Sequence, residues 1–576
     1  MTAQPHHRPG SGPAPRLPRP PSWRRLTAVL WWIEHAFERS RAQARPEEDT
    51  RVRIFLILAV FAVVFACLGV RAAWSALAAP VLDGAGAGVQ RQLTRGDLVD
   101  RNGRLLATNV VFWGLYVDPA EVWDKDQAFA QIRRALPEVD ARRLRRALDG
   151  DRRVLVRGAM TPQQKARVHA LGLGGIGFEQ EDGRVYPLGG SARHVIGVSD
   201  AWGKGLTGAE LALDADLTRA GVDGSAVPLS IDLRIQGIVE SELAAAMEET
   251  GAKNGVALVT NVHTGEILAM ASWPTTQAKN LATSGHYEMG SVFKSFTVAA
   301  GIDRGLADME TTFDASQALV IGNRRITDFH AQNRVMTLED VYIHSSNIGT
   351  SQLAMQLGPE GMKGYFQRLG LLNAAPLELK ESAAPVLPRE WSNSTLASLS
   401  FGYGIMVTPV QAVAAMGALT NGGFYVPLSI RKGGAGAEPV RVVQASTSVM
   451  LLDLMRRNVV RGSGTRADAP GLRVGGKTGS ANKWTGTRYD STLGVGSFAA
   501  VFPTDGPLDG PRYAIFVLVD EPSNGPRTGG FVAAPAVGRI ADRIAPLVGV
   551  ERRADRWRTA DGEKIPTLED MERDLG

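Results

Sequence analysis

The sequence predicts an α+β protein with a single N-terminal transmembrane helix. An unbroken apolar run, Ile54–Val70, is close to the length that spans a bilayer. In the C-terminal half, strand patterns lie at both ends of a region with helical patterns. Such an order implies one antiparallel sheet with an inserted helical lobe. The 576 residues are too many for one domain, so we expect at least two.

Composition excludes several kinds of partner and cofactor. The formal net charge is +5, and no basic stretch interleaved with aromatic residues follows the first fifty residues, so we expect no nucleic-acid partner. Cys67 is the one cysteine, which leaves no disulfide and no thiolate metal site. The nine histidines are scattered, without a His-x-x-x-His spacing. We therefore expect no metal and no other cofactor.

Residues 1–50 are expected to form a cytoplasmic tail, because their many prolines and arginines cannot pack a core. The tail contains an aromatic and basic stretch, Trp23–Ile33. This stretch is either an interfacial or partner-binding helix, or a short helix without a role at the lipid. The sequence leaves both interpretations open.

Residues 51–74 are expected to form the transmembrane anchor. Arg51 and Arg53 precede the apolar run and Arg71 follows it, with more arginines upstream, so the positive-inside rule keeps the N-terminus in the cytoplasm. Everything downstream then lies on the far side of the membrane. Ala76–Ala78 also resembles a signal-peptide cleavage site, but the leader would be far longer than usual, so we favour a retained anchor.

Residues 75–225 show no catalytic pattern. A turn at Asn102-Gly103 between short apolar strands predicts a hairpin within Arg95–Ala107. Asp126–Leu148 has charged helical patterning, and glycine-rich turns follow it. We interpret this part of the chain as structural.

From Leu229 onward the patterns predict a compact domain. A helix rich in Glu and Ala leads into a hairpin of buried strands, and helices and further strands follow. The expected helices are 235–250, 338–357, 408–419 and 533–548, and the expected strands are 256–261, 267–271, 472–474, 495–502 and 513–519. The charged tail after Glu551 is expected to be solvated.

The stretch Glu288–Lys294 carries the most informative chemical pattern. Gly290 permits a turn, and the apolar residues after it predict a helix that puts Ser291 and Lys294 on one face. A serine hydroxyl becomes a nucleophile when a base takes its proton, and a lysine whose pKa is lowered by burial is such a base. The alternative is an N-capping serine with a solvated lysine, and Ser429–Lys432 fits the same four-residue pattern.

Two further patterns follow along the chain. Ser345–Asn347 is typical of a polar loop between helices, where Ser345 is suited to pass a proton and Asn347 to hold a substrate amide and the lysine of the first pattern. Lys477–Ser480 follows two glycines on an expected strand, where a fixed positive charge and hydroxyls suit a peptide substrate that ends in a carboxylate. Each pattern alone also fits an ordinary loop or turn, so their order favours one joint site.

The set Ser-x-x-Lys, Ser-x-Asn and Lys-Thr-Gly resembles that of penicillin-binding proteins and serine β-lactamases. Upstream, the Arg-Gly-x-x-x-Asp-Arg-Asn-Gly signature from Arg95, the Tyr186-Pro187 step and the turn Gly205–Glu210 resemble the pedestal of class B penicillin-binding proteins. Three segments are most similar to the division-specific branch, the FtsI type: Glu288–Lys294, Phe401–Gly404 and Thr408–Gln411. Elongation-specific relatives usually have proline before the glycine of the first motif.

This resemblance implies an elongated β-rich pedestal of the dimerisation type and a transpeptidase domain like that of penicillin-binding proteins and serine β-lactamases. The latter has an antiparallel sheet with helices on both faces and a helical lobe. The expected parts are the tail 1–50, the anchor 51–74, the pedestal 75–225, the transpeptidase domain 226–550 and a charged tail 551–576.

The resemblance also implies a serine-type peptidoglycan D,D-transpeptidase that cross-links stem peptides during septal wall synthesis and is inhibited by β-lactams. Ser291 is then the nucleophile that forms an acyl-enzyme with the D-Ala-D-Ala end of the stem peptide. The implied catalytic residues are Ser291, Lys294, Ser345, Asn347 and Lys477, and the implied substrate-binding residues are Thr478, Gly479 and Ser480. Many relatives have threonine where this chain has Ser480, and the hydroxyl is kept.

The implied location is the inner (cytoplasmic) membrane, crossed once, with the catalytic domain in the periplasm. The implied partners are peptidoglycan stem peptides, a SEDS-type glycosyltransferase and other membrane proteins of the division complex. Several alternatives stay open: an elongation-type class B transpeptidase, a membrane-anchored D,D-carboxypeptidase, a β-lactamase, a β-lactam sensor, or a non-catalytic division scaffold.

Overall fold

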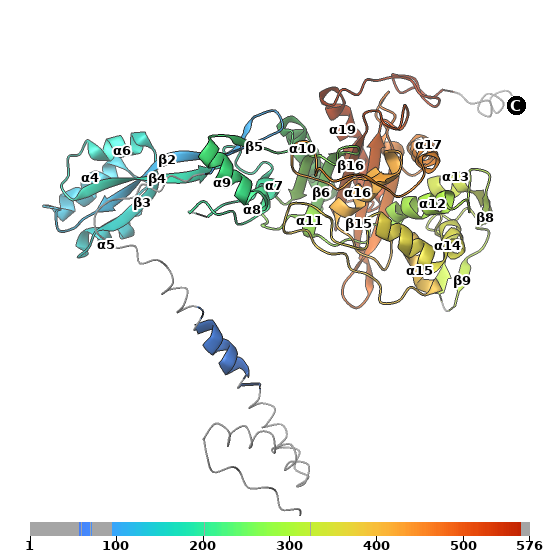
Figure 1. The fold of residues 1–576 in the computed structure, drawn as a ribbon, viewed down its shortest axis with the longest axis horizontal. Helices are drawn as coiled ribbons and strands as arrows, with labels where there is room; N and C mark the ends of the chain where they lie inside the picture. The colour runs from blue at the N-terminus through green and yellow to red at the C-terminus, as the bar shows by residue number, and fades with distance from the viewer. Residues whose placement is uncertain are drawn as a thin grey trace, which may run out of the picture. The chain divides into compact units, whose positions relative to one another are not determined.

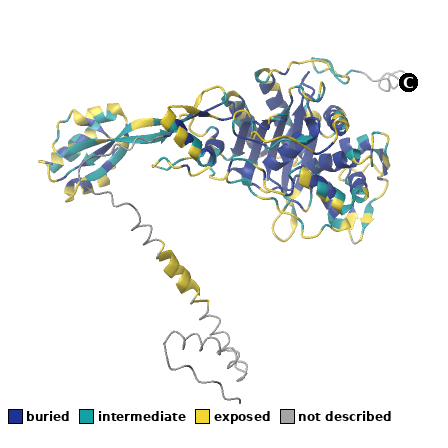
Figure 2. Ribbon diagram, viewed as in Figure 1, coloured by how far each residue is buried: buried dark blue, intermediate teal, exposed yellow. Residues whose placement is uncertain are grey.

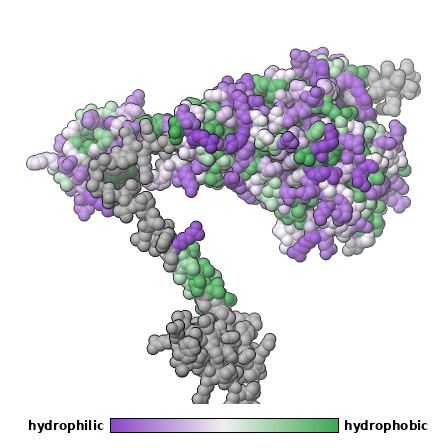
Figure 3. Space-filling model, viewed as in Figure 1, coloured by the Kyte–Doolittle hydropathy of each residue, from purple (hydrophilic) through white to green (hydrophobic). Residues whose placement is uncertain are grey.

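The computed structural model describes residues 57–58, 60–69, 71, 95–200, 202–322 and 324–565 (Figure 1). The chain divides into two compact units, residues 1–89 and 90–576. In the first unit the described residues are helical and exposed (Figure 2), and their surface is largely hydrophobic (Figure 3). Within the described ranges, no helix combines the length and the apolar character needed to cross a membrane. The expected tail 1–50, the rest of the expected anchor and Ala76–Ala78 lie outside the described residues.

The second unit begins with a small α/β head. The strand β2 (Leu105–Val117) pairs antiparallel with β3 (Val154–Met160) and with β4 (Ile176–Val185). Three helices pack on this sheet and share one buried apolar cluster with it: α4 (Lys125–Ala135), α5 (Ala141–Asp149) and α6 (Pro162–His169). The helical segment expected at 126–148 is therefore confirmed, as two helices that are each capped by an aspartate side chain.

The predicted hairpin near Asn102-Gly103 is confirmed. β1 (Asp97–Val99) pairs antiparallel with β2 and parallel with β5 (Ala226–Pro228). In the turn, the Asp100 carboxylate accepts hydrogen bonds from the backbone amides of Asn102 and Arg104, each at 2.8 Å. These bonds fix the turn of the hairpin.

Three short helices follow the head: α7 (Arg193–Ile196), α8 (Gly208–Ala212) and α9 (Asp214–Asp223). The α8 residue Glu210 is fully buried and accepts hydrogen bonds from Arg95 Nε at 2.6 Å and Arg184 Nε at 2.9 Å. The two ends of the upstream signature, Arg95 and Glu210, thus form one buried ion pair.

The larger domain is built on a five-stranded antiparallel sheet in the order β14-β15-β16-β6-β7. Its strands are β6 (Asn254–Asn261), β7 (Ile267–Trp273), β14 (Gly475–Trp484), β15 (Tyr489–Phe502) and β16 (Tyr513–Asp520). Strands from both ends of the domain's sequence therefore meet in one sheet, as predicted, and Figure 2 shows them buried.

Helices cover both faces of this sheet. Along β6, Ala257 and Val259 pack with α10 (Leu233–Thr250) and α19 (Ala534–Ile544), whereas Val256 and Leu258 belong to the cluster on the other face. That cluster contains the helical lobe: α12 (Phe293–Asp303), α13 (Leu338–Ile343), α14 (Asn347–Arg368), α15 (Asn393–Ser400), α16 (Pro409–Thr420) and α17 (Ala445–Arg461). The predicted α+β fold of this domain, with helices on both faces, is confirmed.

The remaining elements are short. They are α11 (Leu281–Ser284), β8 (Thr312–Asp314), β9 (Leu319–Ile321), β10 (Arg324–Ile326), β11 (Val335–Thr337), β12 (Phe424–Tyr425), β13 (Val440–Arg441), α18 (Gly529–Val532) and the 3₁₀ turns η1 (Gly290–Val292), η2 (Thr465–Ala467) and η3 (Ala545–Leu547).

One expectation was wrong and another holds only in part. The strand expected at 472–474 begins at Gly475 instead, because Arg473 has a φ of +53°, which a strand cannot accommodate. The tail after Glu551 is solvated only in part as far as residue 565, where its residues are exposed or half-buried. Its Asp555 forms a buried ion pair with Arg456 on α17, and Trp557 packs against arginine guanidinium groups.

Candidate active site

The first motif lies where η1 runs into α12, so the predicted helix start is confirmed. Ser291 is half-buried in the 3₁₀ turn, and Lys294, in the first turn of α12, is almost fully buried. Gly290 has a φ of +52°, and a Cβ atom there would lie 2.3 Å from the carbonyl oxygen of Ser480. Only glycine fits this close approach, which brings the turn that carries Ser291 against β14.

The second motif lies in the break between α13 and α14. Ser346 caps α14, since its hydroxyl accepts a hydrogen bond from Gly349 N at 3.0 Å. Lys294 Nζ donates to the carbonyl oxygen of Ser345 and, at 3.0 Å, to its hydroxyl. The first two motifs are therefore joined through the lysine.

The third motif lies on β14, at the end of the sheet order, where the outer edge pairs with no other strand of this sheet. Lys477 is fully buried, and its Nζ donates to Ser345 Oγ at 3.0 Å. One hydroxyl thus lies between two lysine amines that are 183 residues apart in sequence, counted from Lys294 to Lys477. The structure brings all three motifs together.

Asn347 differs from its expected contact. Its side-chain nitrogen donates to the carbonyl oxygen of Thr327 at 2.9 Å, while in the described part of the chain the hydrogen bonds of Lys294 Nζ go to Ser345. The expectation that Asn347 holds Lys294 was wrong, because the side-chain amide of Asn347 is hydrogen bonded to the backbone of Thr327 instead. Asn347 is the first residue of α14, two positions after Ser345.

The predicted substrate-binding residues follow Lys477 along β14. The hydroxyl of Thr478 hydrogen bonds with that of Ser463 at 2.7 Å, and the hydroxyl of Ser480 accepts from Gly529 N at 3.0 Å. A Cβ atom at Gly479 would lie 2.3 Å from the carbonyl oxygen of Met289. Gly479 therefore permits the close packing of β14 on the first motif.

Burial sets the chemistry of the two lysines. It lowers the pKa of Lys477 to about 7. The pKa of Lys294 is also lowered well below its usual value, first by burial and then by the charge of Lys477, and the carboxylate of Asp328 opposes this shift. A lysine amine that is neutral near physiological pH is able to act as a general base.

Sequence reasoning missed two carboxylates beside these motifs. Asp328 accepts hydrogen bonds from Ser346 Oγ at 2.7 Å and from the backbone amide of Asn347 at 2.6 Å. Glu288 is buried, and its Oε1 accepts from Gly404 N and Tyr489 Oη, each at 2.7 Å. Asp328 belongs to no motif. Glu288 begins the first motif stretch, but its partners lie more than a hundred residues away, so no local pattern indicates its contacts.

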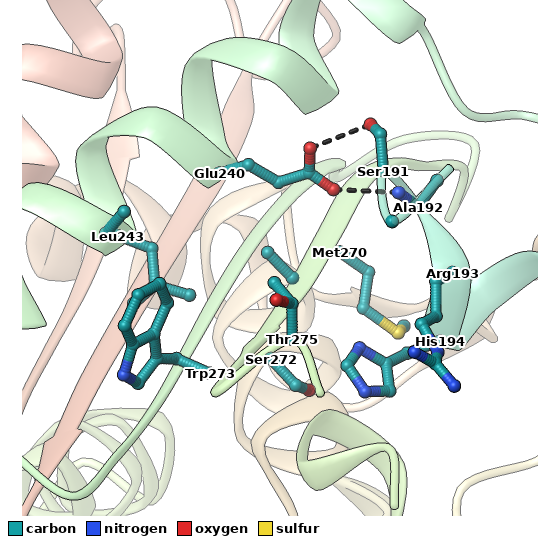
Figure 4. Close-up of a pocket in the computed structure, with 13 residues that line it drawn as sticks. Ser191, Ala192, Arg193, His194, Glu240, Leu243, Met270, Ser272, Trp273 and Thr275 are labelled. Atoms are coloured by element: carbon teal, nitrogen blue, oxygen red, sulfur yellow. Dashed lines mark hydrogen bonds between the residues drawn. The ribbon is translucent and has the colours of Figure 1, made fainter. Parts of the chain in front are cut away.

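A cavity of about 290 Å³ lies where the segment after the pedestal head packs on α10 and β7 (Figure 4). Figure 4 shows the Glu240 carboxylate accepting hydrogen bonds from Ser191 Oγ and Ala192 N. Trp273 and His194 line the same space. The cavity contains no motif residue. We interpret it as a structural feature of the contact between residues 190–194 and the larger domain.

Comparison with known proteins places this geometry in a family. Residues 255–542 match the model of the penicillin-binding protein transpeptidase domain, and residues 91–212 match the penicillin-binding protein dimerisation domain. The chain is 48% identical over 568 residues to the probable peptidoglycan D,D-transpeptidase FtsI of Caulobacter vibrioides, covering 94% of this chain and 96% of the relative. The chain belongs to the FtsI family of penicillin-binding proteins.

More distant members of the family are also similar to this penicillin-binding protein. Peptidoglycan D,D-transpeptidase FtsI of Escherichia coli K12 is 29% identical over 508 residues, which cover 80% of this chain and 85% of the relative. The transpeptidase domain of Burkholderia pseudomallei penicillin-binding protein 3, in its apo structure, is 32% identical with a TM-score of 0.52. That match covers 57% of this chain and 98% of the solved one.

No group of three or more His, Cys, Asp or Glu side chains in the described ranges of this penicillin-binding protein is arranged to hold a metal ion.

Proposed function

We propose that this chain is a peptidoglycan D,D-transpeptidase that cross-links stem peptides in septal wall synthesis through an acyl-enzyme on Ser291. The observation that carries the proposal is the shared hydroxyl of Ser345, which lies 3.0 Å from both Lys294 Nζ and Lys477 Nζ. Lys294 is then the base for Ser291, and the hydroxyl of Ser345 is the path along which the proton moves. The names of the relatives supply the reaction class.

In the first half-reaction, neutral Lys294 takes the proton of Ser291 Oγ, which attacks the carbonyl carbon of the penultimate D-alanine. The developing oxyanion is held by the backbone amides of Ser291 and Ser480, whose chain segments are in contact at Gly290. The peptide bond then breaks, and the proton returns through Ser345 to the nitrogen of the departing D-alanine.

In the second half-reaction, an amine of a neighbouring stem peptide attacks the ester carbonyl. Its proton returns along the same path, Ser291 regains its hydrogen, and the new amide bond is the cross-link. β-Lactams would stop the cycle at the acyl-enzyme, because their ring opens onto Ser291 without releasing a leaving group.

Substrate recognition is assigned to β14 and the second motif. Lys477 and Thr478 are suited to the terminal carboxylate of the stem peptide, and Asn347 to a peptide amide. Gly479 and Ser480 present an unpaired strand edge along which an extended peptide can form backbone hydrogen bonds.

We assign the catalytic domain to residues 226–550 and the pedestal to residues 75–225, with the anchor at 51–74 holding the protein once in the inner membrane. The catalytic domain then lies in the periplasm. Polymerisation of the glycan is assigned to a partner, a SEDS-type glycosyltransferase of the division complex. No nucleic acid and no cofactor enter the proposal.

The test is labelling of the purified full chain with a fluorescent penicillin, followed by peptide mass analysis of the labelled residue. We expect the label on Ser291 and none on Ser291→Ala. The matched control is Ser429→Ala, because Ser429 has the same Ser-x-x-Lys spacing but is buried and bonded to Glu378. Labelling that persists in Ser291→Ala, or is lost in a folded Ser429→Ala, would contradict the assignment.

A second assay separates cross-linking from hydrolysis. A D-Ala-D-Ala pentapeptide is supplied with and without a free amine acceptor, and the products are identified by mass. Transpeptidation predicts an amide product that contains the acceptor. If water is the acceptor even when amine is abundant, the chain is a D,D-carboxypeptidase. Cells that carry only Ser291→Ala are expected to fail at septation, and normal septa would favour a non-catalytic scaffold.

A further inference from the structure

Ser345 holds its place in the site through a backbone conformation that is rare for serine. Its φ is +60°, in the left-handed region. A residue other than glycine stays in this region only when the surrounding structure restrains it. The position of the Ser345 hydroxyl between two lysines therefore depends on what holds the chain next to it.

Asp328 supplies that restraint from the segment between β10 and β11. Its Oδ1 accepts hydrogen bonds from the backbone amides of Asn347 at 2.6 Å and Ile348 at 2.9 Å. Its Oδ2 accepts from Ser346 Oγ at 2.7 Å. One half-buried carboxylate thus binds the three residues that directly follow Ser345.

The same carboxylate also acts on the charge of the site. Lys294 and Lys477 are both buried and share one hydroxyl, so two amines compete for protons in a small space. The groups around them are Asp328, the neutral phenol of Tyr342, whose pKa is raised by burial, and Ser345. The imidazole of His344, next in sequence, is directed instead to Asp340, with Nε2 3.9 Å from Oδ1.

We propose that Asp328 is a positioning residue for this active site, which holds the chain after Ser345 by hydrogen bonds from Ser346, Asn347 and Ile348 and whose negative charge favours the charged form of Lys294. This inference rests on the proposed function, since it concerns the same acylation of Ser291. Asp328 does not itself touch the reacting atoms. It acts through Ser345 and through the protonation of Lys294.

Two substitutions separate the two roles. Asp328→Asn keeps an oxygen that accepts the amides of Asn347 and Ile348 but removes the charge. Asp328→Ala removes the charge and all three hydrogen bonds. The readout is the second-order rate constant of acylation by a fluorescent penicillin between pH 5 and 10, with thermal unfolding as the check on folding.

We expect Asp328→Asn to keep its plateau rate within about threefold of wild type. Its acidic limb should move to lower pH, because the negative charge of Asp328 raises the pKa of Lys294 and its removal lowers that pKa. Neutral Lys294 then persists at lower pH. Asp328→Ala should lose about 10- to 100-fold in rate at every pH, since Ser345 is no longer held.

The matched control is Asp314→Asn, at an exposed carboxylate of the same lobe that binds only the local Ser316 in the described part of the chain. It removes an equal charge, and its pH profile should equal that of wild type. An acidic limb that does not move in Asp328→Asn, or a folded Asp328→Ala with the wild-type rate, would overturn the inference. If Asp328→Ala does not fold, the Asp328→Asn profile alone decides. A wild-type protein that is not acylated at all would instead refute the proposed function.

Discussion

The backbone of Gly290 lies against the backbone of Ser480, so closely that a Cβ atom at Gly290 would sit 2.3 Å from the Ser480 carbonyl oxygen. The obstacle is backbone rather than a flexible side chain, and Gly290 also has a φ of +52°. This contact joins the turn that carries the nucleophile to the strand that carries Lys477. The geometry of the oxyanion site therefore depends on the absence of one methyl group.

Gly290→Ala is expected to lower the free energy of unfolding by about 2–4 kcal/mol and to reduce acylation by penicillin at least 100-fold. The added methyl must push the turn away from β14, which separates the two amides proposed to hold the oxyanion. Urea unfolding and the acylation rate constant measure the two effects.

The control for this substitution is Gly305→Ala, just beyond the other end of α12. Gly305 also has a positive φ, +67°, but no atom lies within 4 Å of an added Cβ. Gly305→Ala should lower the free energy of unfolding by about 1 kcal/mol, because alanine is strained at a positive φ. It should react with penicillin at the wild-type rate. Equal losses of reactivity in both variants would mean that the contact with Ser480 does not matter.

The sequence identified the motifs but not what holds them. The Ser-x-x-Lys pattern occurs at Ser291, Ser429 and Ser480. Local context favoured Ser291 over Ser429, because only Ser291 is followed by a helical apolar pattern. The structure agrees, since Ser429 is buried and bonded to Glu378. The helices and strands of the larger domain were predicted for the same reason, that their apolar periodicity is local.

Contacts between distant segments could not be predicted in this way. The bond from Tyr489 to Glu288 spans 201 residues, and that from Ser346 to Asp328 joins a motif to a loop without a pattern of its own. The start of β14 was also misplaced, because the left-handed conformation of Arg473 depends on its surroundings rather than on its propensity. Such features become visible only when the chain is folded.

Lys477→Met is expected to stabilise the protein at pH 7 and to lose about half of this advantage by pH 9. The pKa of Lys477 is about 7 in the folded state against an ordinary value of 10.5, so between these values the unfolded chain binds more protons and wild-type stability rises with pH. Below pH 7 Lys477 is charged in both the folded and the unfolded state, so the full free-energy cost of burying its ammonium group lowers the stability of the wild type. The difference between pH 7 and pH 9 should be about 2 kcal/mol.

This prediction is checked by urea unfolding of both proteins at each pH. Lys363→Met, at an exposed position on α14, controls for the loss of one positive charge. A stability difference between wild type and Lys477→Met that is the same at pH 7 and pH 9 would show that Lys477 is not held at a lowered pKa.

Asp555→Ala is expected to destabilise the larger domain by about 2–4 kcal/mol. Its carboxylate lies 2.5 Å from Arg456 Nε, with both side chains less than a tenth exposed. Arg456 also donates to the carbonyl oxygen of Val474, the residue before β14. Loss of Asp555 leaves a buried guanidinium short of one partner and loosens the start of the substrate-binding strand.

Thermal unfolding and the acylation rate measure this effect, and Asp561→Ala, at an exposed carboxylate of the same tail, is the control. The control should match wild type in both measurements. If both variants behave alike, the C-terminal segment to residue 565 contributes no stability, and its packing on α17 is incidental.

Glu210→Gln is expected to unfold the region around α8 more readily, at a cost of about 3–5 kcal/mol, without altering the motif side chains. Glu210 is fully buried and accepts from Arg95 at 2.6 Å and Arg184 at 2.9 Å. Glutamine has one oxygen, which can accept from only one of the two guanidinium groups. Its amide nitrogen then faces the second guanidinium group, so a buried cation loses its partner.

Limited proteolysis of the full chain should then cut between residues 95 and 225 at lower urea concentrations than in wild type, while penicillin still labels the protein in the absence of urea. Glu138→Gln removes an exposed carboxylate 3.9 Å from Arg167 and should leave the cleavage profile unchanged. Cleavage of Glu210→Gln at the wild-type urea concentration would mean that the Arg95–Glu210 pair does not hold the pedestal together.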